Sequence, residues 1–269
     1  MTLSWADVTV RLMKAETQRF RRSAIAALLM LAGTGAAGAA DFVALRDIDP
    51  SIVQAMHYAT PNNFTGKPVA GYENGECLVT RPTADALAKA QEKLSARGLT
   101  LVVFDCYRPT QGVQDFVDWA ERKDLDTEPA KRFYAPDVPP NRLFQLGYIA
   151  HKSGHSRGGT VDLGLAEIGA KVAIGPVPAT GDCRDTAATA GVRDMGTSFD
   201  CFDPRSWVGA KGLSKAQRAN RKALTDAMVS AGFKPYSKEW WHFSLAAGDA
   251  GTAFDFPANA ASLPDATGE

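Results

Sequence analysis

The sequence SGHSRGGTVD, residues 153–162, carries the first half of the pattern that decides the fold. A glycine-rich turn leads from His155 into a short apolar run that contains Asp162. Because side chains alternate across a strand, Asp162 lies on the face opposite Val161 and Leu163. If that apolar pair faces the core, the carboxylate faces a cleft, and the two glycines let the backbone fold His155 back towards it.

The second half of the pattern is EWWHF, residues 239–243, in which a glutamate and a histidine flank two tryptophans. A regular strand would put Glu239 and His242 on opposite faces. They converge only if Glu239 sits at the end of the strand or at a bulge. The chain has four histidines, and only His155 and His242 have such unusual neighbours.

Together His155, Asp162 and His242 offer two imidazoles and one carboxylate. Zinc accepts such ligands at ~2.0–2.2 Å, and catalytic zinc sites keep a fourth position for water. The metal lowers the pKa of this water to about 7 and makes it a usable nucleophile. Glu239 would accept the proton of the water and pass it to the leaving amine. The pattern therefore predicts a hydrolytic site with one Zn²⁺ per chain.

A further candidate, Arg108, lies in FDCYRP, residues 104–109, at the end of a predicted buried strand. It would stabilise the oxyanion of a tetrahedral intermediate. The alternative is a surface arginine that Asp105 holds in place. The other candidates also have simpler interpretations. His155 would be a loop histidine and Asp162 a turn cap, and Glu239 and His242 would be an exposed pair beside core tryptophans. The combination of these residues favours the zinc site.

Signals for helices and strands surround these motifs without a regular βαβ alternation. Apolar periodicity and end signals predict helices over residues 84–97, 110–122 and from Ser214 to near Gly232, the last with a capping box at Gln217. Strands are expected over residues 100–105, 161–163 and 240–244. This order predicts an α+β fold with a largely antiparallel sheet flanked by helices.

Composition limits the classes of function. The chain has 269 residues, of which 45% are apolar and 22% charged, as in an ordinary folded protein of one domain. Thirty basic side chains balance thirty acidic ones. Because no basic excess exists to neutralise a phosphate backbone, we expect no nucleic-acid partner. The sequence does not indicate an oligomeric state.

The first forty residues have the order of a secretory signal. Arginines between positions 19 and 22 precede an apolar run over 24–32, and AGA at 37–39 matches an A-x-A cleavage site. The run is shorter than the ~20 residues of a membrane span. We therefore expect an exported, periplasmic protein with no stable membrane span after cleavage. An uncleaved anchor and a buried N-terminal helix are the alternatives.

The rest of the chain is divided by composition. We expect one catalytic domain over residues 41–245 and a poorly ordered tail over 246–269, where small and polar residues dominate. Within the domain, residues 166–198 contain few large apolar side chains. They resemble a long surface excursion.

Four cysteines, at positions 77, 106, 183 and 201, allow three pairings. An oxidising compartment would favour disulfides. We favour Cys183–Cys201, which would close the excursion, together with Cys77–Cys106. Four reduced and buried thiols are the alternative.

The motifs S-x-H-x6-D and E-W-W-H resemble those of the VanX-type D-alanyl-D-alanine dipeptidases, which are zinc D,D-peptidases with a hedgehog-like fold. Further matching strings are YAT at 58–60, NFTG at 63–66, YRP at 107–109 and MGTSFD at 195–200. The last three strings are more specific to the dipeptidases than the metal-site motifs, which a wider clan shares. The resemblance extends from about residue 52 to residue 243.

The resemblance implies zinc ligation by His155, Asp162 and His242, base catalysis by Glu239, transition-state stabilisation by Arg108, and substrate binding by Ser153, Asp200 and Tyr58. Asp200 would bind the ammonium group of the substrate, and Ser153 would help to hold the other end. A free dipeptide is a zwitterion, so a small closed site needs a carboxylate for one end and donors for the other. Longer peptides would leave such polar groups unpaired.

One segment departs from the family pattern. The connection between Leu165 and Met195 is longer than usual, carries Cys183 and directly precedes the stretch with Asp200. We expect this insertion, residues 166–194, to reshape the mouth of the pocket. A D,D-carboxypeptidase with an open cleft for peptidoglycan stems is one alternative function, and a metal-free peptidoglycan-binding module is another.

Overall fold

The computed structural model describes residues 41–125, 127–185 and 187–263. The predicted signal peptide, residues 1–40, lies outside the described residues. No described helix combines the length and the apolar character that crossing a membrane requires.

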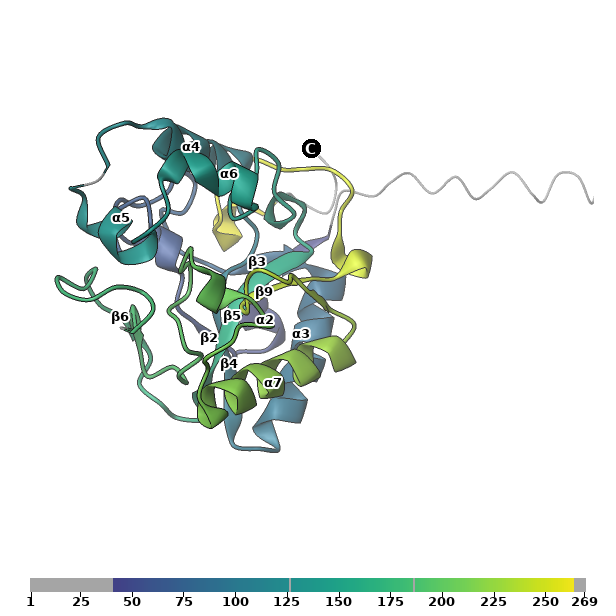
Figure 1. Cartoon of the computed structure of the whole chain (residues 1–269). Coiled ribbons are helices and arrows are strands. Elements are labelled where there is room, and N and C mark those ends of the chain that lie inside the picture. The colour runs from purple at the N-terminus through teal and green to yellow at the C-terminus, as the bar shows by residue number, and fades with distance from the viewer. Residues whose placement is uncertain (1–40, 126, 186, 264–269) are drawn as a thin grey trace, which may run out of the picture. The chain divides into compact units, whose positions relative to one another are not determined.

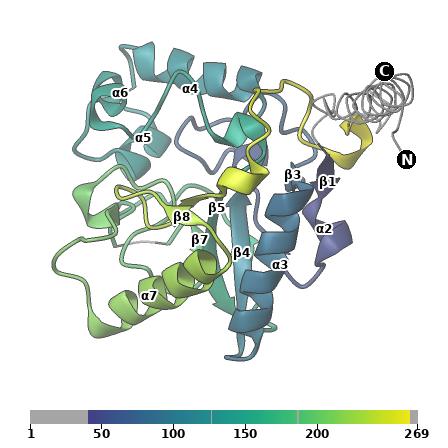
Figure 2. The same ribbon diagram turned by 90° about the vertical axis from the view of Figure 1, so that its right-hand side faces the viewer.

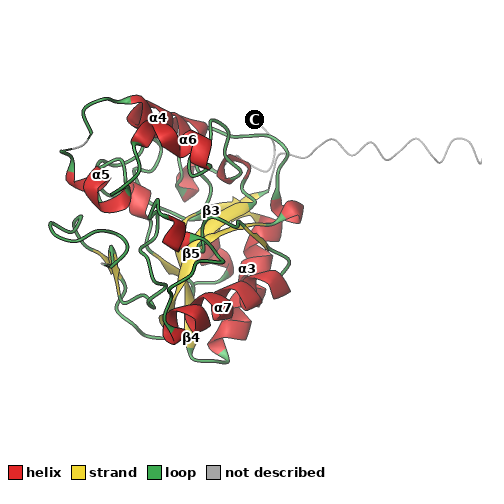
Figure 3. Cartoon of the chain, viewed as in Figure 1, coloured by secondary structure: helices red, strands yellow, loops and turns green. Residues whose placement is uncertain are grey.

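A five-stranded sheet runs through the middle of the described domain (Figure 3). Its strands, in spatial order, are β2 (Val53–Gln54), β4 (Leu99–Asp105), β5 (Thr160–Glu167), β9 (His242–Ser244) and β8 (Lys234–Pro235). Only the β2–β4 pair is parallel, and the other three pairs are antiparallel. The prediction of an α+β fold with a largely antiparallel sheet is confirmed.

Two smaller ladders complete the described strands. β1 (Phe42–Ala44) pairs with β3 (Leu78–Thr80), and β6 (Ala173–Ile174) pairs with β7 (Thr189–Ala190). The second ladder belongs to the predicted surface excursion. That excursion begins later than expected, because β5 continues through Glu167.

The central strands β4 and β5 are buried along almost their whole length. Apolar side chains at consecutive positions suit a strand that is covered on both faces. The β4–β5 register shifts between Val103 and Asp105, so that Asp105 pairs with Asp162. On the other side of β5, Asp162 pairs with His242 of β9. Three polar side chains thus meet at one end of the sheet.

Helices cover the sheet in two groups (Figures 1 and 2). The long helices α3 (Arg81–Ser95) and α7 (Lys215–Ser230) lie side by side against it. The helices α4 (Thr110–Glu121), α5 (Pro129–Tyr134) and α6 (Leu143–Leu146) gather above it in the view of Figure 1. The short α2 spans Leu45–Ile48, and 3₁₀ turns occupy His57–Ala59, Pro140–Arg142, His155–Arg157, Pro204–Ser206, Ala246–Gly248 and Ala260–Ser262.

The three helix predictions are confirmed, although α3 starts three residues earlier and ends two residues earlier than expected. α3 begins at Arg81 rather than at residue 84, because Pro82 fits the first turn, where its missing N–H costs nothing. α7 follows Ser214, whose hydroxyl accepts from the Gln217 amide while the Gln217 side chain accepts from the Ser214 amide. The predicted capping box is therefore confirmed.

Both favoured disulfides are present, Cys77–Cys106 and Cys183–Cys201. The first ties the start of β3 to the end of β4. The second ties the excursion to the loop that follows Asp200. All four cysteines are fully buried.

The stretch 246–263 packs against the domain, although its composition predicts a poorly ordered tail. The rings of Phe254 and Phe256 meet the ring of Phe42 edge-on at 5.3 and 5.2 Å. The Ala258 amide donates to the Gly71 carbonyl at 2.7 Å. The two aromatic residues supply the buried area that the surrounding small residues lack. The division into residues 1–40, 41–245 and 246–269 remains a proposal.

Candidate metal centre and active site

His155, Asp162 and His242 converge, with one ligand atom from each within 4.8 Å of the others. His242 Nδ1 lies 3.0 Å from Asp162 Oδ1, and His155 Nε2 lies 3.4 Å from Asp162 Oδ2. The two imidazole nitrogens are 3.4 Å apart. The β5–β9 register brings Asp162 beside His242.

A tight turn delivers His155 to the same point. The 3₁₀ turn His155–Arg157 ends at Gly158, whose φ of 73° lies in the left-handed region. A Cβ at Gly158 would come within 2.5 Å of the Phe42 ring, so only glycine fits there. This turn is the backbone reversal that the glycine pair in the sequence predicts.

The arrangement of donor atoms fits a bound cation. Asp162 Oδ1 is buried and accepts no hydrogen bond, although His242 Nδ1 is 3.0 Å away. A buried carboxylate oxygen without a partner is costly, and a cation at the point that both atoms face would relieve the cost. His155 Nδ1 donates to the Cys106 carbonyl at 2.8 Å, which leaves Nε2 as a free acceptor. Two imidazoles and a carboxylate are ligands that zinc prefers.

Electrostatics keep these side chains in the forms that bind metals. Burial alone would raise the pKa of Asp162, but His155 and His242 outweigh it and hold that pKa well below its usual range. Burial lowers the pKa of the His242 imidazole. An ionised carboxylate beside a neutral imidazole is the state that a divalent ion requires.

Glu239 lies immediately before β9, in a turn rather than in the strand. Its amide donates to the Tyr236 carbonyl at 3.3 Å, and the His242 amide donates to the Glu239 carbonyl at 3.4 Å. The turn brings Glu239 Oε2 to 3.6 Å from His242 Nδ1, as the spacing of the motif requires. The residue is 7% exposed, and burial followed by the charges of Asp162 and Asp200 raises the pKa of its carboxyl group.

Arg108 is buried beside the three converging side chains. Its Nε and Nη2 donate to Asp105 Oδ2 at 3.1 and 2.6 Å, and Nη2 lies 3.8 Å from Asp162 Oδ2. The guanidinium also stands over the rings of Tyr58 and Phe116, at 5.2 and 4.6 Å from their centroids. Asp105 therefore fixes the arginine, as the simpler interpretation proposed, but in the cavity rather than at the surface.

Asp200 stands on the other side of the cavity. Among the described residues it is the one non-glycine residue with positive φ, at 58°. Tyr58 donates to Asp200 Oδ2 at 2.8 Å, and no described cation forms an ion pair with this carboxylate. Burial, and next the charge of Asp162, raise the pKa of Asp200.

These side chains share one cavity of ≈ 220 Å³. All eight residues singled out in the sequence line it: Tyr58, Arg108, Ser153, His155, Asp162, Asp200, Glu239 and His242. Ser153 Oγ accepts from the His155 amide at 3.2 Å, at the wall nearest Lys152.

Sequence reasoning missed one charged residue of the cavity, Lys152, and considered a second, Asp105, only as the partner of a surface arginine. Lys152 lines it and forms no ion pair with any described residue, so it is a free cation there. Asp105 lies behind Arg108, and its Oδ1 also accepts from Tyr72 at 2.5 Å. The signal for Asp105 was its place between a buried strand and Arg108, and no pattern pointed to Lys152.

A family model described as "D-ala-D-ala dipeptidase" matches residues 38–177 and 182–260. The chain belongs to this family. Its members are zinc metallopeptidases, so the predicted enzyme class and the predicted family are both confirmed. The D-Ala-D-Ala dipeptidase match is interrupted only at residues 178–181, two residues before Cys183.

Several relatives carry the name D-alanyl-D-alanine dipeptidase. The protein from Enterococcus faecalis is 38% identical over 70% of this chain and 83% of its own length. Those from Enterococcus faecium and Streptomyces coelicolor are each 35% identical, over 76% and 81% of this chain and 91% and 98% of their own lengths. A vancomycin resistance D,D-pentapeptidase, VanY, solved with Zn(II), is 15% identical with a TM-score of 0.33, over 64% of this chain and 74% of that chain.

The insertion of this D-Ala-D-Ala dipeptidase family member does not contribute to the cavity that holds the triad. None of its described residues in the range 166–194 lines the 220 Å³ cavity. Many of them line a second cavity of ≈ 250 Å³, which Phe104, Phe199 and Trp240 also border. The insertion therefore lies behind the loop that carries Asp200, and the expectation that it shapes the mouth is corrected.

Proposed function

We propose that this enzyme hydrolyses the free dipeptide D-Ala-D-Ala, with one Zn²⁺ held by His155, Asp162 and His242. The observation that carries the proposal is the single small cavity in which this triad and the Asp200 carboxylate face each other. The names of three curated relatives point to the same substrate.

When bound, Zn²⁺ supplies a Lewis acid that polarises the scissile carbonyl and lowers the pKa of water. Glu239 accepts the proton of the attacking water and delivers it to the leaving amine nitrogen. Arg108 donates to the oxygen on which negative charge develops. Because Asp105 and two aromatic rings already hold Arg108, little reorganisation is needed when that charge forms.

The cavity matches both ends of a zwitterion. Asp200 receives the ammonium group, and Tyr58 holds the Asp200 carboxylate in place. At the other end, the Ser153 hydroxyl and the Lys152 ammonium group receive the carboxylate. The volume of ≈ 220 Å³ lies below the ~300–1,000 Å³ of common ligand pockets, which favours a substrate of dipeptide size.

A substrate panel tests this proposal. Turnover is measured on D-Ala-D-Ala, its N-acetyl and C-terminal amide derivatives and a stem pentapeptide, with and without a chelator. We expect hydrolysis of the free dipeptide only, loss of activity on chelation and recovery with one equivalent of Zn²⁺. Faster release of D-Ala from the pentapeptide would instead show a D,D-carboxypeptidase. Absence of hydrolysis, with pentapeptide binding that is indifferent to chelation, would show a binding module.

We also propose that residues 1–40 are a cleaved signal and that the mature enzyme is periplasmic, without a stable membrane span. The two disulfides support export, because they persist in oxidising compartments. When the whole chain is expressed in a Gram-negative host, we expect periplasmic protein whose N-terminal residue lies near position 41. Cytoplasmic protein that keeps its first forty residues would contradict export.

A further inference from the structure

We infer that the Cys183–Cys201 disulfide positions the Asp200 carboxylate for the substrate, so that loss of this one bond weakens substrate binding. The inference rests on the proposed function, since it assigns the insertion a role in the same cavity. Neither cysteine lines that cavity. The disulfide is therefore a positioning element and touches no reacting group.

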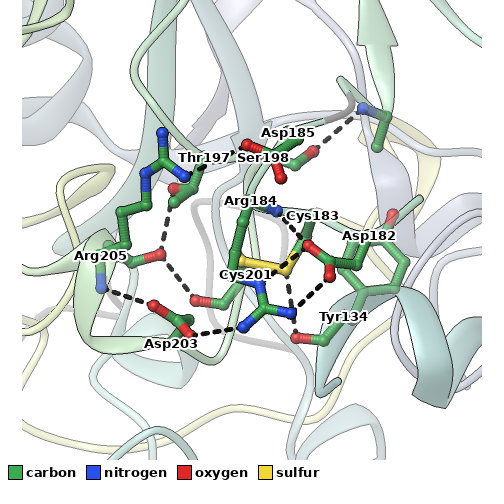
Figure 4. Close-up of a disulfide and its surroundings, with 12 residues drawn as sticks. Tyr134, Asp182, Cys183, Arg184, Asp185, Thr197, Ser198, Cys201, Asp203 and Arg205 are labelled. Atoms are coloured by element: carbon green, nitrogen blue, oxygen red, sulfur yellow. Dashed lines mark hydrogen bonds and ion pairs between the residues drawn. A yellow bond between two sulfur atoms is a disulfide. The ribbon is translucent and has the colours of Figure 1, made fainter. Parts of the chain in front are cut away.

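Cys183 holds both flanks of Asp200. On one flank its carbonyl accepts from the Ser198 amide at 2.7 Å. On the other flank its sulfur is bonded to Cys201, the residue directly after Asp200. Figure 4 shows this disulfide between the insertion and the Asp200 loop. One residue of the insertion thus anchors the loop on both sides of the carboxylate.

Cys183 is itself fixed to the body of the domain. Its amide donates to the Phe133 carbonyl at 3.0 Å, in α5. The neighbouring Tyr134 carbonyl accepts from the Phe202 amide at 2.8 Å, so α5 also holds the far end of the loop. The Tyr134 hydroxyl donates to Asn62 Oδ1 at 2.7 Å. Because α5 fixes Cys183, Cys183 can in turn hold Asp200 in a fixed position.

A second set of contacts surrounds the disulfide. Arg184 donates through Nη2 to Asp182 Oδ2 at 2.6 Å and lies 3.7 Å from Asp203 (Figure 4). The Ala188 amide donates to the Ser198 hydroxyl at 3.0 Å. These contacts bind the insertion to residues on both sides of Asp200. The Arg184 contacts are partly exposed and the Ala188–Ser198 hydrogen bond is buried, but the disulfide is the one covalent link between the insertion and this loop.

Asp200 needs such an anchor because of its backbone. A φ of 58° is unfavourable for a residue with a Cβ, so a loop free to move would relax towards ordinary conformations. One hydrogen bond from Tyr58 holds the carboxylate itself. A misplacement of about 1 Å in a binding group can cost up to ~10²-fold in rate. The metal triad lies on other elements, β5, β9 and the His155 turn, and should keep its geometry.

The test compares the zinc-loaded full chain with a Cys183→Ser/Cys201→Ser variant. We expect KM for D-Ala-D-Ala to rise about tenfold or more, with kcat changed much less and zinc content unchanged. Variants are preferable to a reductant, which would also open Cys77–Cys106, where the Cys106 carbonyl holds His155. A Cys183→Ala/Cys201→Val pair fills the same buried space and serves if the serine pair does not fold.

A double-mutant cycle tests whether the disulfide affects KM through Asp200. Asp200→Asn alone should raise KM, because the ammonium group loses its charged partner. If the disulfide acts through Asp200, removing it from the Asp200→Asn enzyme should add little further change. Additive rises in KM would show that the disulfide does not act through this carboxylate.

Leu94→Ala in α3 is the control for general destabilisation, because Leu94 is fully buried and does not line the cavity. We expect it to lower the melting temperature and leave KM unchanged. An equal rise in KM in this control, or an unchanged KM in the folded disulfide variants, overturns the inference. If the wild-type enzyme does not hydrolyse D-Ala-D-Ala, the proposed function fails, and calorimetric binding of the dipeptide to the same variants tests the positioning role.

Discussion

Glu239→Gln is expected to keep stoichiometric zinc and to lower kcat for D-Ala-D-Ala by about 10²–10⁴-fold. The amide has the shape of the carboxylate but cannot accept the proton of the attacking water. Glu239 lies beside the triad, with Oε2 at 3.6 Å from His242 Nδ1, and is 7% exposed. No other described carboxylate that lines the cavity is free for this step, because Asp162 belongs to the triad and Asp200 is bound by Tyr58.

Steady-state kinetics and metal analysis of the same samples check this prediction. Glu121→Gln is a matched control, since Glu121 is exposed at the end of α4. The control should retain full activity and zinc. Turnover in Glu239→Gln comparable to that of the wild type would remove the base assignment. Loss of zinc in that variant would place Glu239 among the ligands instead.

The second large effect is expected on metal content. His155→Ala and His242→Ala should each lose bound zinc on dialysis and, with it, hydrolysis. Either change leaves two protein ligands, whereas catalytic zinc sites use three. The remaining Asp162 carboxylate would then be buried with one imidazole fewer beside it, so we also expect a lower melting temperature.

His151→Ala is the control for these variants, because His151 is exposed and stacks on the Phe144 ring at 4.4 Å. It should bind one zinc per chain and turn over normally. Zinc measured by elemental analysis after dialysis gives the readout. A full equivalent of zinc in either His155→Ala or His242→Ala would exclude that residue as a ligand.

These two experiments distinguish loss of the metal ligands from loss of the general base. The triad variants should lose both zinc and activity, whereas the glutamine variant should lose activity alone. Lys152 and Asp105 lie next to this machinery, and the sequence indicated a role only for Asp105, as the partner of Arg108. Lys152 is a free cation beside Ser153, and Asp105 is the anion that holds Arg108.

The amino-acid sequence alone was enough to select the residues that converge in the cavity and to predict the main elements. Zinc-type ligands were visible because the residue types and their spacing are local properties of HSRGGTVD and EWWH. Helix ends were visible for the same reason, since the Ser214 capping box involves neighbours along the chain. The two disulfides were the pairings favoured from the sequence, but only the structure excluded the other pairings and four reduced thiols.

Long-range packing decided the rest. The insertion lies behind Asp200 because Cys183 meets α5 and Cys201, contacts that no local pattern encodes. The stretch 246–263 packs on the domain because Phe254 and Phe256 contact the Phe42 ring. Asp105 pairs with Asp162 through a register shift between two strands. Chain order specifies which groups are available, but the free energy of burying them together selects which distant groups meet.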